Sequence, residues 1–322
     1  MTEITTEKNE QRFTEFKEGG RFDYPEGIVN VTMGLHGGEA TLIKSAEKTV
    51  LHDCGMAYCA PQIVENIKKE LEGRHLDYIL VSHTHYDHIG ALPYIRKAFP
   101  EATVCGSAYA KYVFTRQGAL NVMKELGTAA AKLYGNGDEE IITDGMVVDL
   151  VMNDGDKLDL GDKYIVALET KGHTDCAMTF VLEPDSIMFT SESTGICLGP
   201  DNVSVAILKS FDESIASAEK CRNYGPKQII SPHFGVIPPV HTNHFLDTFE
   251  KKAYEEREYV VGMWNRGLTP DEMLEIAIKD VFEGGRGEEQ PYEAFVSNTK
   301  VIIKLYEQYA DPEKKYNRKE AE

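Results

Sequence analysis

Three histidines and one aspartate lie within six consecutive residues of this chain, from 83 to 88. Neutral imidazole and carboxylate are ligands that zinc, iron and manganese share, and packing alone does not explain such a density of them. The segment follows the apolar run Tyr78 to Val81, which is typical of a buried strand. The sequence therefore predicts a metal site at the carboxyl end of a strand. The predicted ligands are His83, His85, Asp87 and His88.

Three later residues stand in the same kind of position, where a strand is expected to give way to a loop. His173, Glu192 and His233 each come shortly after an apolar run with β-type composition. The repeated placement argues against coincidence. We therefore expect these three side chains to complete the metal site that begins at residues 83–88.

With these residues in place, the chain resembles the metallo-β-lactamase fold superfamily from about Ile28 to His233. The shared pattern is His-x-His-x-Asp-His, a later Gly-His-Thr, an acid after a strand end and a final histidine. The resemblance implies two divalent metal ions, with zinc as the first expectation and iron or manganese as alternatives. It also implies that Asp53 orients a metal ligand. The implied ligand sets are His83, His85 and His173 for one ion, and Asp87, His88 and His233 for the other.

The acid between the two ions departs from the family pattern. This position is usually Asp, whereas this chain has Glu192. Glutamate is one methylene longer, so it can bridge both ions if the strand end recedes slightly, or it can bind one ion only.

The fold that the resemblance implies is α/β, a four-layer αββα metallo-β-lactamase sandwich with a C-terminal helical extension. We expect a polar N-terminal segment, a metallo-β-lactamase-fold domain, a C-terminal helical cap and a charged tail. Their expected bounds are 1–20, 21–240, 241–310 and 311–322. Strands are predicted at 28–32, 40–43, 49–51, 78–81, 102–104, 147–150, 164–168, 178–182, 187–189 and 228–230. Helices are predicted from 61, over 89–99, 107–134 and 214–223, and in the cap over 242–266, 270–283 and 292–309.

Composition restricts the classes of function. The formal charge of −19 and a pI near 5.0 disfavour contact with nucleic-acid phosphates. No apolar run reaches the roughly 18 residues that a membrane-spanning helix needs, so we expect no membrane partner. The six cysteines form no CxxC pair, and the polar start lacks the apolar core of a secretory signal. We therefore expect a cytoplasmic protein that acts on a small molecule.

The first functional hypothesis is a dinuclear metallohydrolase that cleaves a small acyl compound, such as a thioester, lactone or ester. Asp87 would orient the attacking water or accept its proton, and Cys176 is not expected to act as a nucleophile. The helical cap resembles that of glyoxalase II and the quinolone-signal thioesterase. Its large apolar residues either wall a pocket or pack on the sandwich, and the cap could also form a homodimer. These residues are Phe245, Phe249, Tyr259, Met263 and Trp264.

Two other hypotheses remain open from the sequence. A bridging carboxylate also suits iron, which favours a diiron oxidoreductase acting on oxygen or nitric oxide. Those members usually carry an acid where this chain has His85, and they rely on a flavin domain that this chain lacks. The third possibility is a regulatory protein that keeps the metal site and contacts a partner through its cap.

Overall fold

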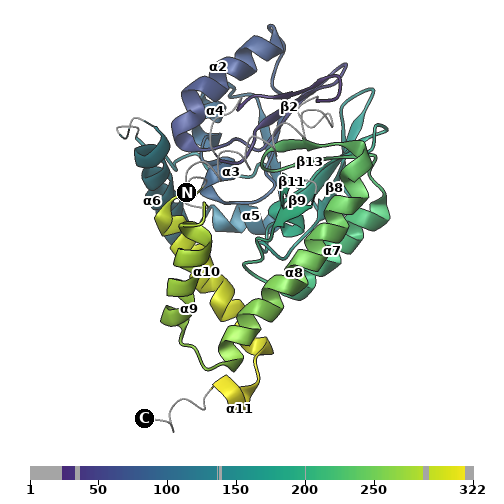
Figure 1. Ribbon diagram of the computed structural model, residues 1–322. Helices are drawn as coiled ribbons and strands as arrows, with labels where there is room; N and C mark the ends of the chain where they lie inside the picture. The colour runs from purple at the N-terminus through teal and green to yellow at the C-terminus, as the bar shows by residue number, and fades with distance from the viewer. Residues whose placement is uncertain are drawn as a thin grey trace.

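The computed structural model describes residues 24–32, 37–135, 137, 140–199, 201–285 and 290–315. The predicted segment 1–20 and the end of the charged tail lie outside these residues. Two six-stranded β-sheets form the centre of the molecule, and helices cover their outer sides (Figure 1). The four-layer αββα sandwich predicted from the resemblance is confirmed, and helices follow it at the C-terminus.

The first sheet has the strand order β1-β2-β3-β4-β5-β6. Its first three strands are antiparallel neighbours, whereas β3, β4, β5 and β6 run parallel. The two strands predicted at 28–32 and 40–43 pair as the antiparallel strands β1 and β2, where Ile28 lies opposite Ile43. The strands are β1 (Ile28–Asn30), β2 (Thr41–Lys44), β3 (Thr49–His52), β4 (Tyr78–Leu80), β5 (Thr103–Gly106) and β6 (Leu150–Val151).

The second sheet has the order β14-β13-β10-β9-β8-β7. Strands β8 and β10 both pair antiparallel with β9 and so run in the same direction, and β13 pairs parallel with β10. The strands are β7 (Lys157–Asp159), β8 (Tyr164–Glu169), β9 (Met178–Glu183), β10 (Ile187–Phe189), β13 (Gln228–Ser231) and β14 (Gly235–Ile237). A separate hairpin joins β11 (Ile196–Gly199) and β12 (Asn202–Ser204).

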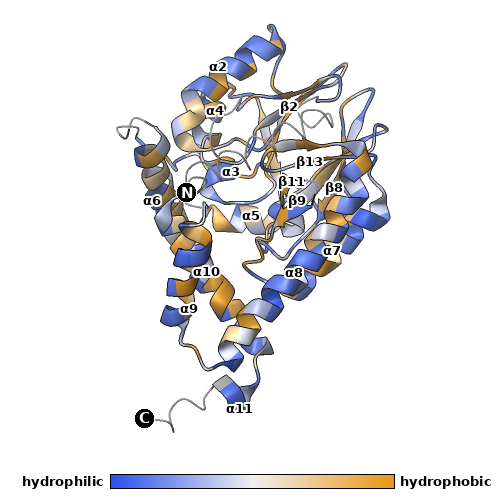
Figure 2. Cartoon of the chain, in the orientation of Figure 1, coloured by the Kyte–Doolittle hydropathy of each residue, from blue (hydrophilic) through white to orange (hydrophobic). Residues whose placement is uncertain are grey.

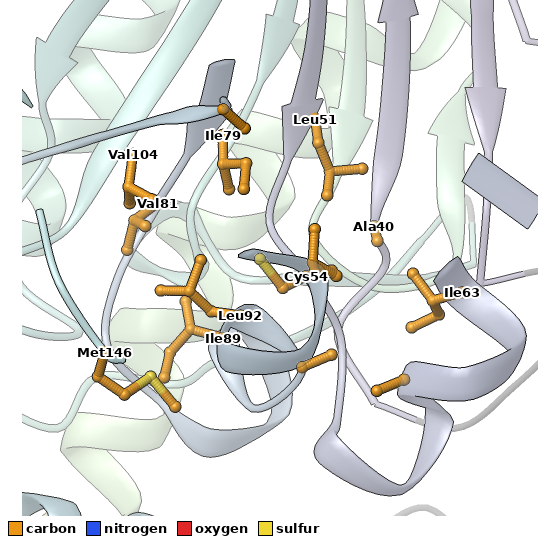
Figure 3. Close-up of a cluster of buried hydrophobic side chains, with 14 of the residues drawn as sticks. Ala40, Leu51, Cys54, Ile63, Ile79, Val81, Ile89, Leu92, Val104 and Met146 are labelled. Carbon is orange, nitrogen blue, oxygen red and sulfur yellow. The ribbon is translucent and has the colours of Figure 1, made fainter. Parts of the chain in front are cut away.

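Three apolar clusters hold the four layers together. Alternate residues of one strand point to opposite faces, so Val50 packs between the two sheets while Leu51 packs against the helices outside the first sheet. Figure 3 shows that outer cluster, in which Leu51 and Ile79 from the sheet lie near Leu92. The third cluster joins the outer face of the second sheet to α7 (Phe211–Tyr224) and α8 (Thr242–Asn265).

Helices of the sandwich lie on both outer sides. Helix α2 has a proline in its first turn, as predicted, because proline lacks the N–H that this position leaves unpaired anyway. The helices before the second sheet are α2 (Ala60–Leu71), α3 (Tyr86–Ile89), α4 (Leu92–Ala98), α5 (Ala108–Val113) and α6 (Gln117–Tyr134).

The predicted C-terminal helices are present. Thr269 and Glu272 form a capping box at the start of α9. Figure 2 shows hydrophilic and hydrophobic residues mixed along α8, α9 and α10, as expected for helices that bury one side. Within the described residues, no helix combines the length and the apolar character needed to cross a bilayer. After α8 come α9 (Pro270–Ala277), a π-helical turn η4 (Ile278–Phe282), α10 (Tyr292–Tyr306), η6 (Glu307–Tyr309) and α11 (Pro312–Lys315).

Two predicted elements differ from the structure. The single helix predicted over 89–99 is instead two short helices, α3 at 86–89 and α4 at 92–98. Helix α3 starts earlier than predicted, because the N–H groups of His88 and Ile89 both donate to the carbonyl of His85 and close a turn. The strand predicted at 147–150 is wrong except at its last residue. The Asp149 carboxylate accepts the Val104 N–H at 3.0 Å, so a side chain makes a bond that a strand would supply.

Candidate metal centre

Strand direction brings the predicted metal ligands to one edge of the sandwich. His83 follows β4 of the first sheet, while His173, Glu192 and His233 follow β8, β10 and β13 of the second. Because these three strands run in the same direction, their carboxyl ends meet at the same edge. All seven predicted ligands lie within two overlapping groups of side chains, in each of which the ligand atoms are within 4.8 Å of one another.

The first group contains His83, His85, His173 and Glu192. The His173 Nε2 atom lies 2.9 Å from His85 Nδ1 and 2.7 Å from Glu192 Oε2. His83 Nε2 lies 4.0 Å from the same carboxylate oxygen. This is the set that the resemblance assigned to one ion, together with the acid.

The second group contains Asp87, His88, His233 and again Glu192. Nε2 of His233 lies 2.7 Å from Glu192 Oε1 and 3.1 Å from Nε2 of His88. The Asp87 Oδ2 atom is 3.5 Å from each of these two imidazole nitrogens. The geometry therefore places a second cluster of ligand atoms directly beside the first.

Glu192 is the side chain that both groups share. It lies in η2 (Glu192–Thr194), a short 3-10 turn after β10, and it is 6% exposed. Its Oε2 atom faces the first group and its Oε1 atom faces the second. The extra methylene relative to aspartate therefore does not prevent contact with both groups, and the orientation is that of a bridging carboxylate.

Asp53 fixes the orientation of the His88 ring by contacting its Nδ1 atom, while Nε2 of the same ring faces the second group. Its carboxylate accepts hydrogen bonds from the N–H and the hydroxyl of Ser82 at 2.8 and 2.6 Å, and it lies 3.1 Å from His88 Nδ1. An imidazole N–H that donates to this carboxylate leaves the lone pair of Nε2 pointing into the second group. Asp53 adopts a φ of 55°, an uncommon conformation for a residue other than glycine. The role predicted for Asp53 agrees with this contact.

The donor atoms fit a bound metal ion. His83 Nε2 is buried and has no hydrogen-bond partner among the described residues, a costly arrangement unless a ligand completes it. On a tetrahedral zinc with bonds of about 2.0 to 2.1 Å, two donor atoms lie roughly 3.3 Å apart. The distances of 2.7 to 4.0 Å between donor atoms in both groups bracket that separation. The assignment of these residues as ligands stays a prediction.

Charges within the cluster move the pKa values of its members apart. Burial and the neighbouring histidines lower the pKa of His83 well below its usual value and that of His85 to about 4. Burial alone would also lower the pKa of His88, but the charge of Asp87 and hydrogen bonds to Asp53 and Glu192 raise it well above its usual value. Without a metal ion, His88 is therefore a positively charged imidazolium at neutral pH, with a proton on both ring nitrogens, while His83 and His85 are neutral imidazoles.

Binding of Zn²⁺ at pH 7 is expected to release about one proton per chain, because a ligand imidazole must give up the proton that His88 holds. His83 and His85 add none, since their pKa values lie below 7. Calorimetric titration of chelator-treated protein in two buffers of different ionisation enthalpy measures this number. Zinc binding with no proton release would contradict the assignment of His88.

Two glycines beside the site, neither of them among the predicted residues, allow close packing around the histidines. A Cβ on Gly38 would lie 2.5 Å from the His88 ring, so only glycine leaves room for that imidazole. Gly172 has a φ of 129°, and a Cβ there would meet the backbone of Ser214 at 2.5 Å. The glycine before His173 is part of the Gly-His-Thr motif and could have been identified from it, whereas Gly38 carries no such signal.

A family model described as the metallo-β-lactamase superfamily matches residues 33–233. The chain belongs to the metallo-β-lactamase superfamily. The match ends at the last predicted ligand, so it covers the sandwich and not the C-terminal helices. Membership agrees with the arrangement of the two ligand groups at one edge of the sheets.

Two relatives match part of this chain at low sequence identity. A metallo-β-lactamase fold-containing protein of Sulfurisphaera tokodaii is 27% identical over 51% of this chain and 62% of its own length. An atrochrysone carboxyl ACP thioesterase of Aspergillus fumigatus is 20% identical over 72% of this chain and 62% of its own length. The chain thus spans less than two thirds of both relatives.

A solved structure extends the likeness in fold. A metallo-β-lactamase family protein of Thermus thermophilus superimposes with a TM-score of 0.61, covering 88% of this chain and 95% of the other at 16% identity. The likeness shows a shared fold that reaches beyond residues 33–233.

Proposed function

We propose that this protein is a dinuclear metallohydrolase that cleaves an acyl compound, with thioesters, lactones and esters as its substrate class. The observation that carries the proposal is the position of Glu192, whose two carboxylate oxygens face two separate groups of imidazoles. Membership in the superfamily and the thioesterase among its relatives support hydrolysis of an acyl group.

Two divalent ions held by these groups would supply a water of lowered pKa and polarise the substrate's carbonyl oxygen. The residues of the chain have separate tasks. Asp53 and Ser82 fix the imidazole of His88, and the Ala206 carbonyl accepts the Nδ1–H of His173, so both rings are held in place. Asp87, whose side chain is 17% exposed, reaches the cavity and can accept a proton from water.

The reaction adds water across the acyl bond. The oxygen of water bonds to the acyl carbon, the C–S or C–O bond breaks, and the proton accepted by Asp87 passes to the leaving thiol or alcohol. No nucleophilic side chain is needed. Burial raises the pKa of the Cys176 thiol, which agrees with the prediction that this residue is not a nucleophile.

The metal-loaded protein is expected to hydrolyse at least one class in a panel of thioesters, lactones, esters and phosphodiesters, with acyl compounds preferred. His85→Ala removes a predicted ligand and should abolish the activity. Initial rates for both proteins, at equal concentration and with matched circular dichroism spectra, measure this. The proposal fails if no compound is cleaved, or if His85→Ala cleaves at the wild-type rate.

A further inference from the structure

A cavity of about 1550 Å³ begins at the candidate metal centre and extends away from it between the helices. Small-molecule sites commonly measure about 300 to 1,000 Å³, so this cavity is larger than a small acyl compound needs. The residues of the metal centre that line its inner end are His85, Asp87, His173, Glu192 and His233.

Helices form the outer wall of the cavity. Val122 and Leu126 come from α6 of the sandwich, Tyr259 and Met263 from α8, and Val301 from α10. Helices α6 and α10 lie side by side in Figure 1, although 157 residues (135–291) separate the end of α6 from the start of α10. The sandwich and the C-terminal helices thus line one continuous space.

The alternatives left open for the cap's large residues are both found. Tyr259 and Met263 line the cavity. Phe245, Phe249 and Trp264 pack in the apolar cluster on the second sheet, and the Trp264 Nε1–H donates to the Ile303 carbonyl at 3.0 Å. Met263 belongs to this cluster as well, so four of the five residues anchor the cap.

Large apolar side chains of the outer wall remain in contact with water. Val122, Tyr259, Val281 and Val301 line the cavity and are 52%, 54%, 48% and 42% exposed. These side chains face a cavity and not a neighbouring helix. An apolar ligand that covers them binds favourably, because it removes their apolar surface from water. The four residues come from α6, α8, η4 and α10, so such a ligand would contact four helical elements that are far apart along the chain.

The charges of the cavity disfavour an anionic ligand. Among the described residues that line it, Lys252 is the one lysine or arginine, and its Nζ pairs with Glu255 at 2.9 Å. Glu39 and Glu256 add further carboxylates. A phosphate or carboxylate on the part of a ligand that enters the cavity would meet acidic groups, so an uncharged part fits better.

We propose that the substrate's acyl group is long and apolar, with its carbonyl carbon at the metal centre and its hydrocarbon chain along the wall formed by α6, α8, η4 and α10. This inference rests on the proposed hydrolase function and names its substrate class more narrowly. The cavity is continuous with the metal centre, where the carbonyl carbon would lie. We therefore assign the cavity to the acyl part of the substrate, which extends from that carbon. Hydrolysis of such a thioester consumes one water and yields a long-chain carboxylic acid and a free thiol.

Binding can be measured apart from catalysis. Chelator-treated protein is titrated calorimetrically with primary alcohols from butanol to decanol, which are uncharged and have no bond to hydrolyse. Each added CH₂ is expected to tighten binding about fourfold, the equivalent of about 0.8 kcal/mol. With metal-loaded protein, kcat/KM for N-acetylcysteamine thioesters is expected to rise with acyl length from acetyl to decanoyl.

A matched pair of variants on one helix tests the wall. Val122 and Leu133 both lie on α6 and are 52% and 53% exposed, but only Val122 lines the cavity. Val122→Asp is expected to weaken decanol binding by at least about tenfold, since the alkyl chain would bury a carboxylate. Leu133→Asp should leave both decanol binding and acetyl thioester hydrolysis unchanged.

The outcomes separate the two proposals. Cleavage of all thioesters at rates independent of acyl length, or equal decanol binding by Val122→Asp and Leu133→Asp, would overturn the assignment of the cavity alone. Alcohol binding that strengthens with length while no thioester is cleaved would overturn the hydrolase function and leave the cavity's apolar ligand in place.

Discussion

Replacing Asp87 with asparagine is expected to lower kcat by about 10²- to 10⁴-fold, the usual contribution of a positioned general base. Asparagine keeps the size of the side chain but cannot accept a proton from water. The carboxylate stands 3.5 Å from the Nε2 atoms of both His88 and His233, at the border between the second ligand group and the cavity. Steady-state kinetics on an acyl substrate measure the effect.

Asp175→Asn is the matched control. Asp175 lies two residues after His173, and its carboxylate pairs with Lys209 at 3.0 Å. This variant should keep wild-type kcat. If Asp87→Asn keeps its metal content and loses kcat, its main role is to accept a proton, whereas loss of metal would make it chiefly a ligand. Wild-type kcat in Asp87→Asn would remove Asp87 from the mechanism.

Asp53→Asn is expected to weaken metal binding by about 10- to 100-fold, the range found when a group that orients a ligand is lost. An asparagine at this position can still accept the Ser82 backbone N–H with its amide oxygen. Its NH₂ group then takes the place of the carboxylate oxygen that faces both the Ser82 hydroxyl and His88 Nδ1. The imidazole would then accept at Nδ1 and carry its proton on Nε2, the atom that faces the ligand group. Competition with a chromophoric chelator measures the affinity.

Asp162→Asn controls for the hydrogen-bonding pattern. The Asp162 carboxylate likewise accepts from a serine hydroxyl, that of Ser45, and from a backbone N–H, that of Ala46, but it contacts no histidine. Metal affinity should be unchanged in this variant. Equal metal affinities of Asp53→Asn and wild type would show that the Asp53–His88 contact does not determine which ring nitrogen of His88 carries the proton.

Residue chemistry predicted most of the site because its ligands are concentrated in recognisable positions. The density of histidines at 83–88 and the placement of His173, Glu192 and His233 after strands are visible in the sequence, and the structure brings them together. The sandwich could be predicted for a related reason. Short continuous apolar runs such as Tyr164 to Leu168 are typical of strands buried on both faces, and β8 is buried in this way.

The remaining features depend on tertiary contacts. Strands β7, β11, β12 and β14 have only three or four residues each and show no clear period, and none of them was predicted. Which carboxylate oxygen of Glu192 faces which group depends on where β10 ends relative to β8 and β13. The cavity joins α6 to helices far along the chain, and no local pattern shows that Val122 and Val301 line the same space.

The metal content of protein purified without chelator, measured by elemental mass analysis beside Glu192→Ala, tests the dinuclear centre most directly. We expect about two divalent ions per wild-type chain and about one or fewer in the variant, because both ligand groups lose the carboxylate they share. Zinc or manganese would favour the hydrolase, and iron would favour the oxidoreductase. Wild-type protein that binds no metal, or a metal content that Glu192→Ala leaves unchanged, would contradict the account.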